Sequence, residues 1–360
     1  MDYHLLQSID ARTGGGLVGS CLELASAQRE IGVNSQVIST TCGELRHSTD
    51  HLIIAPRKFH TPILYAEGLF KHLKSIDRTD MIHNHGLYMY TSWLATKLKK
   101  TRDIRMMVHV HGMMEPWILR RSKLKKAIVN LLFENYKYKN AEYWRALTHK
   151  EADQIRGFGV NGKIIIAPNG IDLEPIDSFL ENLKKVPVEK KTILFLGRLH
   201  EKKGLVPFLK TWLSLPLSIR RQWQLKIAGP DDGALSELFN LKGTNDGVEF
   251  LGPVTGQRKF EVLEQCDLFV LPSFSEGFSM ALLEACAFSK PIILTDQCNF
   301  SEAFEFGGMR LSEVDFWKNE LIEILSTKPE ELGQRGASLR SLVEQKYLWN
   351  TIAQDLQDQL

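Results

Sequence analysis

Short apolar runs alternate with helix-patterned segments along most of the chain. The first half predicts strands at 3–9, 33–40, 81–85, 104–110 and 141–148, and helices at 17–31, 90–100, 115–139 and 149–158. The second half predicts strands at 191–199, 223–229, 248–252, 267–272 and 291–296, and helices at 204–214, 234–241, 255–265 and 278–288. Strands that alternate with helices are typical of parallel α/β sheets, so we expect one such sheet in each half.

A polar stretch rich in turn-forming residues, at 172–188, separates the two halves. We therefore place the domain boundary there and predict one domain at 1–175 and another at 176–360. A chain of 360 residues is long enough for two separate cores. The last helical segment, 347–360, fits the second domain but could also pack back on the first.

The composition is that of an ordinary globular protein, with 43% hydrophobic and 24% charged residues, which excludes extended disorder. Its five cysteines are scattered and form no CxxC pair, as expected in a reducing compartment. No signal-peptide pattern is found, and no apolar run approaches the roughly 20 residues of a membrane helix. We therefore expect a soluble, cytoplasmic protein.

Charge is distributed unevenly, although the net charge is only +2. Residues 1–175 hold 24 Lys and Arg against 17 Asp and Glu, whereas residues 176–360 hold 21 against 26. The basic first half indicates an anionic partner. Five of its basic residues lie within 120–126, on an apolar-striped helix at 119–139. This helix either lies on an anionic membrane or packs with a solvated basic face.

Two loops that follow predicted strands have the composition of phosphate-binding loops. In Thr13–Gly16 (TGGG), three glycines let backbone N–H groups approach a phosphate at a helix N-terminus, with a flexible turn as the alternative. In GRLHEKKG (197–204), Arg198 and Lys203 form a pair suited to a diphosphate, with a solvated basic turn as the alternative. Ligands of open parallel sheets bind at such strand ends.

The stretch SEGFSMALLEA (275–285) places one carboxylate before a predicted helix and another within it. We expect the helix to begin at Phe278 or Ser279, so that its free N–H groups bind an anion. Glu276 should then face neutral hydroxyls, because a bound diphosphate would repel it, and Glu284 can reach back to a ribose diol. Together these groups describe a nucleoside diphosphate sugar. The alternative is that the two glutamates bind no ligand, one being a helix-capping residue and the other a solvated residue of the helix. For either glutamate taken alone, this alternative would be favoured.

Two H-x-H pairs, His83/His85 and His109/His111, have the spacing that puts both members on one face of a strand. Such pairs could bind zinc, as in metal-dependent hydrolases, but no obvious carboxylate cluster accompanies them, so we favour a site without metal. The second member of each pair precedes a glycine at a strand end. His111 could act there by donating hydrogen bonds or by positioning a substrate.

The motifs TGGG, HGMMEPW, PNGID, GRLHEKKG and SEGFSMALLE occur in order over almost the whole chain, which in these motifs resembles the family 4 glycosyltransferases with their E-x7-E signature. The resemblance implies an α/β protein of the GT-B fold, with two facing Rossmann-like domains, parallel sheets and an interdomain cleft. It also implies transfer with retention of anomeric configuration and without a metal. One departure is QCNFSEAF (297–304), where the family commonly has a glycine pair, and it leaves the donor sugar open.

The resemblance implies a role for each matching residue. Positions that match Arg198 and Lys203 bind the donor diphosphate, and the position that matches Glu284 binds the ribose. Glu276 would contact the transferred sugar, and His111 would lie near its C6 and the reaction centre, so we expect both in catalysis. We assign the remaining contacts as follows: Gly15, Gly16, Ser279 and Met280 to the diphosphate, Gly277 and Phe278 to the sugar, and Val254 to the nucleobase.

The sequence thus predicts a retaining hexosyltransferase that needs neither cofactor nor metal. It would move a sugar from a nucleotide sugar, with UDP-glucose as the first guess, to a glycan or lipid-linked acceptor in polysaccharide synthesis. The first domain would bind the acceptor and the second the donor, and we expect no nucleic-acid partner. Peripheral contact with the inner face of the cell membrane stays open. Two alternatives also stay open: a nucleotide-sugar epimerase of the same fold, and a zinc-dependent hydrolase that uses His83 and His109.

Overall fold

The computed structural model describes residues 1–9, 16–41, 50–56, 67–73, 75–115, 127–183, 190–241, 243 and 247–360. The chain forms two compact units, which we call unit 1 (Met1–Gly170 and Trp349–Leu360) and unit 2 (Ile171–Leu348). The division after Gly170 lies a few residues before the predicted boundary at 175. The last helix belongs to unit 1, which is the second of the two placements that the sequence left open.

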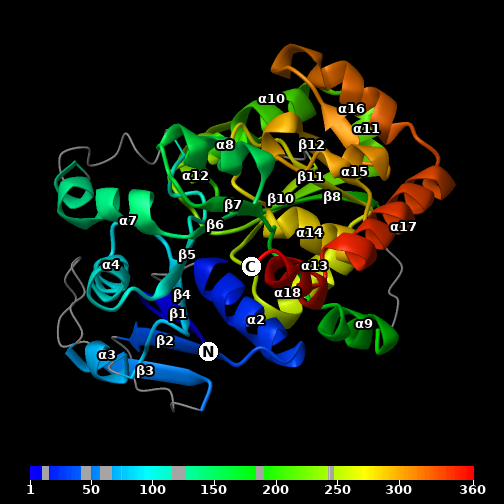
Figure 1. Cartoon of the computed structure of the whole chain (residues 1–360). Helices are drawn as coiled ribbons and strands as arrows, with labels where there is room; N and C mark the ends of the chain where they lie inside the picture. The colour runs from blue at the N-terminus through cyan, green and yellow to red at the C-terminus, as the bar shows by residue number, and fades with distance from the viewer. Residues whose placement is uncertain are drawn as a thin grey trace. The chain divides into compact units, whose positions relative to one another are not determined.

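Unit 1 contains a seven-stranded parallel sheet in the order β3-β2-β1-β4-β5-β6-β7 (Figure 1). The strands are β1 (Asp2–Leu6), β2 (Ser35–Thr41), β3 (Leu52–Pro56), β4 (Met81–His85), β5 (Arg105–His109), β6 (Tyr143–Ala146) and β7 (Lys163–Ile166). The helices are α2 (Gly16–Glu30), α3 (Glu67–His72), α4 (Tyr90–Arg102), a π-helical turn η1 (Asn130–Glu134), α7 (Asn135–Asn140), α8 (His149–Gly157) and α18 (Trp349–Asp358). The sequence missed β3, β7 and α3, which are short and lie beside turn-forming residues.

Unit 2 contains a six-stranded parallel sheet in the order β10-β9-β8-β11-β12-β13. The strands are β8 (Lys191–Leu196), β9 (Trp223–Ala228), β10 (Val248–Gly252), β11 (Leu268–Leu271), β12 (Ile292–Thr295) and β13 (Met309–Leu311). The helices are α9 (Glu174–Glu181), α10 (Leu205–Ser214), α11 (Leu217–Gln222), α12 (Leu235–Leu241), α13 (Gly256–Gln265), α14 (Met280–Ala287), α15 (Glu302–Glu305), α16 (Trp317–Leu325) and α17 (Pro329–Lys346), with 3-10 turns η2 (Glu201–Lys203), η3 (Asp296–Cys298) and η4 (Val314–Phe316). In both units the first strand lies inside the sheet and the order reverses beside it, which is the Rossmann arrangement.

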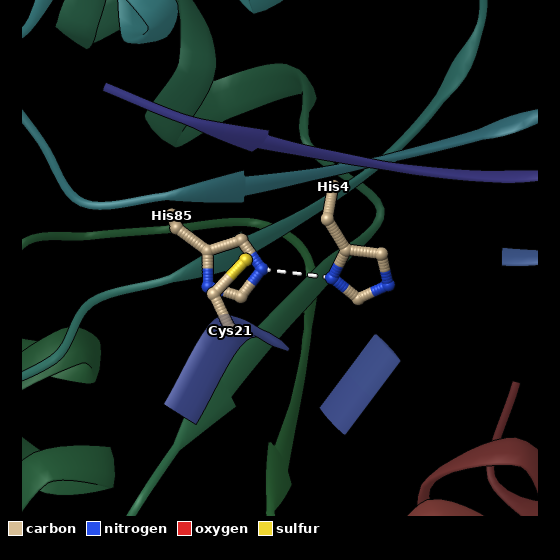
Figure 2. A group of neighbouring side chains, drawn as sticks. All are labelled: His4, Cys21 and His85. Atoms are coloured by element: carbon tan, nitrogen blue, oxygen red, sulfur yellow. Dashed lines mark hydrogen bonds between the residues drawn. The ribbon is translucent and has the colours of Figure 1, made fainter. Parts of the chain in front are cut away.

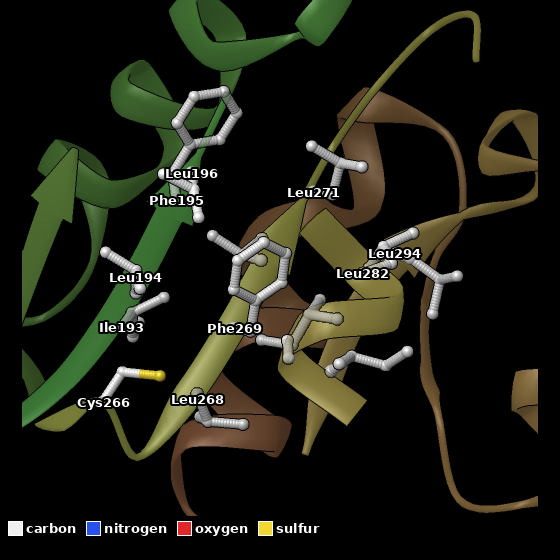
Figure 3. Packing of buried hydrophobic residues seen from close by; sticks show 14 of the residues in the cluster. Ile193, Leu194, Phe195, Leu196, Cys266, Leu268, Phe269, Leu271, Leu282 and Leu294 are labelled. Atoms are coloured by element: carbon white, nitrogen blue, oxygen red, sulfur yellow. The ribbon is translucent and has the colours of Figure 1, made fainter. Parts of the chain in front are cut away.

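The core of unit 2 forms around its two central strands. Side chains of β8 and β11 pack against one another and against α14 and β12 (Figure 3). Parallel strands covered on both faces read as continuous apolar runs, which explains LFVL in β11 and IILT in β12. The same packing includes part of the stretch in which the sequence places the domain boundary. Within 172–188 the chain forms helix α9, whose Ile176 is buried in this core, and Pro175 is tolerated because it lies in the first turn.

The C-terminal helix α18 lies beside α2 in unit 1 (Figure 1). Ile352 and Leu356 of α18 join a buried apolar cluster that includes Leu24 of α2. The chain enters this helix in close contact with Gly170, where an added Cβ would lie 2.7 Å from the Cα of Trp349. Helix α18 is therefore part of the unit 1 core. Across the described ranges, no helix has both the length and the apolar character needed to cross a membrane.

We expect Leu356→Ala to destabilise unit 1 by about 2–5 kcal/mol, because it leaves a cavity between α18 and α2. Hydrogen exchange under native conditions should show faster exchange in β1 and β4 than in the wild type, with β8 and β11 much less affected. Gln357→Ala, at the adjacent exposed position, is the matched control. Equal loss of protection in both units, or none, would contradict the assignment of α18 to unit 1.

Candidate functional site

Most of the predicted donor-binding residues lie where the strand order of unit 2 reverses. Strand β8 pairs with β9 on one side and with β11 on the other. The loop after β8 carries Arg198 and Lys203, and the loop after β11 carries Glu276. Because ligands of open parallel sheets bind outside such a reversal, these two loops form the candidate site of unit 2.

Lys203 and Glu276 form a partly buried ion pair in this site. The Nζ of Lys203 lies 2.6 Å from Oε1 of Glu276, and the two side chains are only 13% and 7% exposed. Ser273, on the same loop as Glu276, donates its hydroxyl to the same oxygen at 2.5 Å. The sequence had placed Lys203 on a diphosphate and Glu276 on a sugar. The structure joins them, so each residue fixes the position of the other.

The two loops also touch through their backbones. Phe274 N–H donates to the carbonyl of Lys202 at 2.7 Å. Gly204 has φ +65°, and an added Cβ would lie 1.9 Å from the carbonyl oxygen of Pro272. The final glycine of GRLHEKKG is thus required for both its left-handed backbone and its close approach to the β11 loop. This close contact between the two loops fixes the position of Lys203 relative to Glu276.

The departure at QCNFSEAF has a structural role in the same site. The carbonyl of Gln297 accepts from the N–H of Glu276 at 3.0 Å, and the side-chain amide of Asn299 donates to the Glu276 carbonyl. Asn299 itself has φ +55°, a left-handed conformation that asparagine tolerates better than most residues. The segment that replaces the glycine pair therefore holds the backbone of Glu276 on both sides. The sequence identified the departure but gave no sign of this contact.

Helix α14 begins at Met280, not at Phe278, because Ser279 has extended dihedrals and caps the helix. The Ser279 hydroxyl accepts from the N–H of Leu282 at 3.4 Å, while Met280 and Ala281 carry first-turn N–H groups without intrahelical partners. The ring of Phe278 packs against Phe300 and Tyr347, with centroids 6.4 and 6.0 Å apart. A sugar contact from Phe278 would have to come from its backbone, beside Gly277.

The two remaining charged residues of the predicted donor site each have an ionic partner. Arg198 Nη1 lies 2.7 Å from Asp232 Oδ2, and Lys259 Nζ lies 2.7 Å from Glu284 Oε1. The Arg198 side chain is 59% exposed, and exposed ion pairs contribute only about 0–1 kcal/mol. Arg198 can therefore exchange Asp232 for another anion at little cost.

The other predicted contacts are less defined. Gly15 lies outside the described residues, and Gly16 is the first residue of α2 in unit 1. Val254 lies between β10 and α13 and is partly buried against the unit 2 core.

Unit 1 contains a cluster of buried histidines on neighbouring strands. His4 of β1 is in register with His83 of β4, and His85 of β4 is in register with His109 of β5. The registered pairs stack, with ring centroids 4.3 and 4.2 Å apart. The diagonal pairs are hydrogen-bonded, at 2.9 Å between His4 and His85 and at 3.0 Å between His83 and His109. The sequence identified the two H-x-H pairs but not His4, because His4 lies in a different strand, far from both pairs in sequence.

His111 follows β5 and joins this cluster. Its Nε2 lies 3.0 Å from Nδ1 of His85. The turn is left-handed at both His111 (φ +51°) and Gly112 (φ +77°). Glu151, from the first turn of α8, accepts from the N–H of Gly112 at 2.5 Å and thereby fixes the turn. The sequence missed Glu151, although Thr148-x-x-Glu151 is a recognisable capping box.

Four imidazoles of this cluster are uncharged over the physiological pH range. Burial lowers the pKa of His111 to about 3, with a smaller contribution from the Arg145 guanidinium. Burial and neighbouring imidazoles also hold the pKa values of His4, His85 and His109 well below the usual histidine value. These groups are therefore neutral and can both donate and accept hydrogen bonds.

Two groups in this cluster have donor atoms close enough for a metal ion: His4, Cys21 and His85 (Figure 2), and His85, His109 and His111. Their ring nitrogens already hydrogen-bond one another, and the buried guanidinium of Arg145 lies 3.5 Å from His109. A divalent cation would have to break these bonds beside a positive charge. The cluster therefore fits a hydrogen-bonded network better than a metal centre.

Comparison with known proteins matches one family model to each half of the chain. A model described as "Glycosyltransferase Family 4" matches residues 14–175, and one described as "Glycosyl transferases group 1" matches residues 179–321. The chain is 30% identical over 190 residues to N,N'-diacetylbacillosaminyl-diphospho-undecaprenol alpha-1,3-N-acetylgalactosaminyltransferase of Campylobacter jejuni subsp. jejuni, a match that covers 49% of this chain and 48% of that protein. The chain spans less than half of the length of the curated relatives that it matches: the match covers 48% of the Campylobacter protein and 41% and 35% of two further relatives.

Solved structures resemble the chain over nearly its whole length. Sucrose-phosphate synthase from Thermosynechococcus elongatus has a TM-score of 0.76 at 18% identity, covering 100% of this chain and 98% of that one. Anabaena HepE in complex with UDP-glucose has a TM-score of 0.71 at 15% identity, covering 99% and 98%. Such low identities show the fold alone.

We expect Gly204→Ala to destabilise unit 2 by at least about 2 kcal/mol, because alanine would both adopt a left-handed backbone and clash with the Pro272 carbonyl. Gly333→Ala is the matched control. It lies within helix α17 with open space around it, so alanine should stabilise the helix by up to about 1 kcal/mol. Thermal unfolding of the two variants gives the comparison. Equal melting temperatures would mean that the two loops do not meet as described.

Proposed function

We propose that this chain, which belongs to the family 4 glycosyltransferases and has their GT-B fold, moves a hexose from a nucleoside diphosphate sugar to a glycan or lipid-linked acceptor in polysaccharide synthesis. The observation that carries the proposal is the grouping at the strand reversal of unit 2. There the ammonium of Lys203 meets the carboxylate of Glu276, three residues before the cap of α14. A cation and a helix N-terminus suit a diphosphate, and a carboxylate suits sugar hydroxyls.

The donor would bind to unit 2. Arg198 would exchange Asp232 for the diphosphate, and Lys203 would use N–H donors beyond the one that it gives to Glu276. Glu284 would accept from the ribose, and Val254 would contact the base. We propose UDP-glucose as donor, a choice supported by the fold that the chain shares with the UDP-glucose complex of HepE.

The transfer would proceed with retention and without a metal. The bond between C1 of the sugar and the diphosphate breaks, and its electron pair leaves with the diphosphate. The acceptor hydroxyl forms the new bond on the same face of C1, and its proton passes to the departing phosphate oxygen. Arg198, Lys203 and the N-terminus of α14 would stabilise the charge on the leaving group. Glu276 would bind hydroxyls rather than attack C1, because Lys203 and Ser273 engage its carboxylate.

The acceptor would bind to unit 1, whose sequence carries the excess of basic residues. An anionic lipid diphosphate fits that charge, and the Campylobacter relative is named for a diphospho-undecaprenol acceptor. His111, in unit 1, would lie near the reacting groups.

We also propose that unit 1 lies on an anionic membrane surface through the segment 127–134. Ile128, Leu131 and Leu132 are exposed there by 59%, 80% and 65%. The C-terminal end of the segment is anchored by a fully buried ion pair between Glu134 and Lys137, 2.9 Å apart. The five basic residues of 120–126, outside the described residues, precede it directly in sequence. Exposed aliphatic side chains next to a basic run are the pattern of an interfacial anchor.

The donor site is tested by thermal shift with UDP, GDP, ADP and their sugars in the presence of a chelator. A ligand at 100 times its dissociation constant should stabilise the wild type by about 2.7 kcal/mol. We expect Arg198→Ala to weaken binding of the preferred nucleotide by about 1.5–3 kcal/mol. Arg156→Ala is the matched control, because Arg156 is also 59% exposed and also pairs with an aspartate.

Unchanged nucleotide affinity in Arg198→Ala would refute the diphosphate assignment. Binding that disappears with chelator would refute metal independence. Conversion of the nucleotide sugar in the absence of any acceptor would favour an epimerase.

The membrane contact is tested by sedimentation with vesicles that contain anionic lipid. Replacing Leu131 and Leu132 together by Asn should weaken binding at least about tenfold, because both side chains would insert between the lipids. Replacing the exposed Leu217 and Phe239 of unit 2 by Asn should have no effect. Equal binding by the two double variants would place the contact elsewhere.

A further inference from the structure

A chain of three imidazoles connects helix α2 with the turn after β5. Gln28 Oε1 lies 2.6 Å from Nε2 of His4. Nδ1 of His4 lies 2.9 Å from Nε2 of His85, a contact shown in Figure 2. Nδ1 of His85 lies 3.0 Å from Nε2 of His111. We call Gln28–His4–His85–His111 the inner chain. It links a buried glutamine to the residue that the proposed function places at the reaction centre.

The amide of Gln28 sets the direction of the inner chain. Its Nε2 lies 3.3 Å from the carboxylate of Asp2, and its Oε1 faces the hydroxyl of Ser35 at 3.1 Å. Asp2 is ionised, because the hydrogen bond from His83 lowers its pKa even though burial raises it. A carboxylate only accepts, so the amide N–H₂ must face Asp2 and the amide oxygen must face His4.

Each following bond is then determined. His4 donates from Nε2 to Gln28, so its Nδ1 must accept from Nε2 of His85. His85 then has Nδ1 as its acceptor, which must receive the N–H of His111 Nε2. This order requires that every ring is neutral, because an imidazolium has no acceptor nitrogen. Burial meets that requirement by lowering the pKa values of all three rings.

We propose that Gln28 and His4, through His85, are positioning residues that hold His111 in its Nε2–H tautomer, so that His111 offers a bare Nδ1 to a substrate hydroxyl. The consequence for His111 rests on the proposed function, whereas its tautomer does not. In this form His111 accepts a hydrogen bond from a hydroxyl through Nδ1 and cannot donate one there. The fixed tautomer therefore selects for a hydroxyl donor and against a carbonyl or an ether oxygen at that position.

A second chain in the same cluster provides an internal comparison. Asp2 Oδ2 lies 3.1 Å from Nε2 of His83, Nδ1 of His83 lies 3.0 Å from Nε2 of His109, and Nδ1 of His109 lies 3.5 Å from Nη1 of Arg145. One end only accepts and the other only donates, so these rings are also protonated at Nε2. This outer chain runs in the same direction but does not include His111. Cutting it at His109, away from Asp2 and Gln28, should leave the tautomer of His111 unchanged.

The tautomer can be measured directly on the full-length chain with ¹⁵N-labelled histidine. Long-range ¹H–¹⁵N correlation separates the protonated from the bare ring nitrogen, and His111→Gln assigns the signals of His111. We expect His111 in the wild type to carry its proton on Nε2 at neutral pH. A proton on Nδ1, or an imidazolium, would overturn the proposal without any variant.

Two cuts of the inner chain test its cause. Gln28→Leu removes the acceptor of His4, and His85→Leu removes the link to His111, so each should shift His111 towards a mixture of tautomers. His109→Gln, which cuts the outer chain at an equally buried position and leaves the hydrogen bond between His83 and Asp2 in place, should keep the wild-type signals. Wild-type signals of His111 in both inner-chain variants would overturn the proposal. If either Gln28→Leu or His85→Leu fails to fold, the signals of the other variant test the proposal.

Transfer kinetics test the role of the tautomer. We expect Gln28→Leu to lower kcat at least about tenfold with a much smaller change in the KM for the donor, because Gln28 lies in unit 1 and not at the donor loops. Unchanged kcat in a variant whose tautomer has shifted would overturn the positioning role. Absence of transfer in the wild type would instead refute the proposed function, and the tautomer measurement would still stand.

Discussion

Both sheets are wholly parallel, and their central strands are covered on both faces, so polar side chains inside them must find most of their partners within the protein. Unit 2 meets this constraint by keeping its central strands apolar and moving its charged residues into the loops. Unit 1 meets it differently, by placing histidines on three adjacent strands in register, where they stack and hydrogen-bond with one another. The chemistry of each unit follows from that difference.

In unit 2, contacts between the protein's own residues hold together the two loops at the strand reversal. The backbone contact at Gly204, the ion pair of Lys203 with Glu276, and the support from Gln297 and Asn299 all converge on one carboxylate. A charge held in this way loses little freedom when a ligand binds, which is the condition for an efficient polar site. The histidine network of unit 1 is constrained in a similar way. It ends at Gln28, Asp2 and Arg145, whose fixed donor and acceptor groups leave each histidine ring only one hydrogen-bonding arrangement.

Much of the fold was readable from the sequence because the signals are local. The alternation of apolar runs and amphipathic segments predicted most strands of both units, including β8 and β11, and helices such as α2 and α14. It assigned nothing over 297–346, where β13, α15, α16 and α17 lie. The misses have physical causes. Helix α9 was not predicted, because its polar residues and Pro175 look like a turn when the buried Ile176 is not known to face a core. Strands β3 and β7 are too short for their periodicity to stand out.

The sequence by itself singled out the residues to which we assign the chemistry, because glycines, paired charges and strand-end histidines stand out at fixed spacings. It identified Arg198, Lys203, Glu276, Glu284 and His111, and the order of motifs that defines the family. Only the tertiary structure decided which of these residues meet. Lys203 joins Glu276, Asn299 supports that glutamate, and His4 enters the histidine cluster from another strand. Such contacts depend on strand order and register, which arise from packing over long sequence separations and leave no local pattern in the chain.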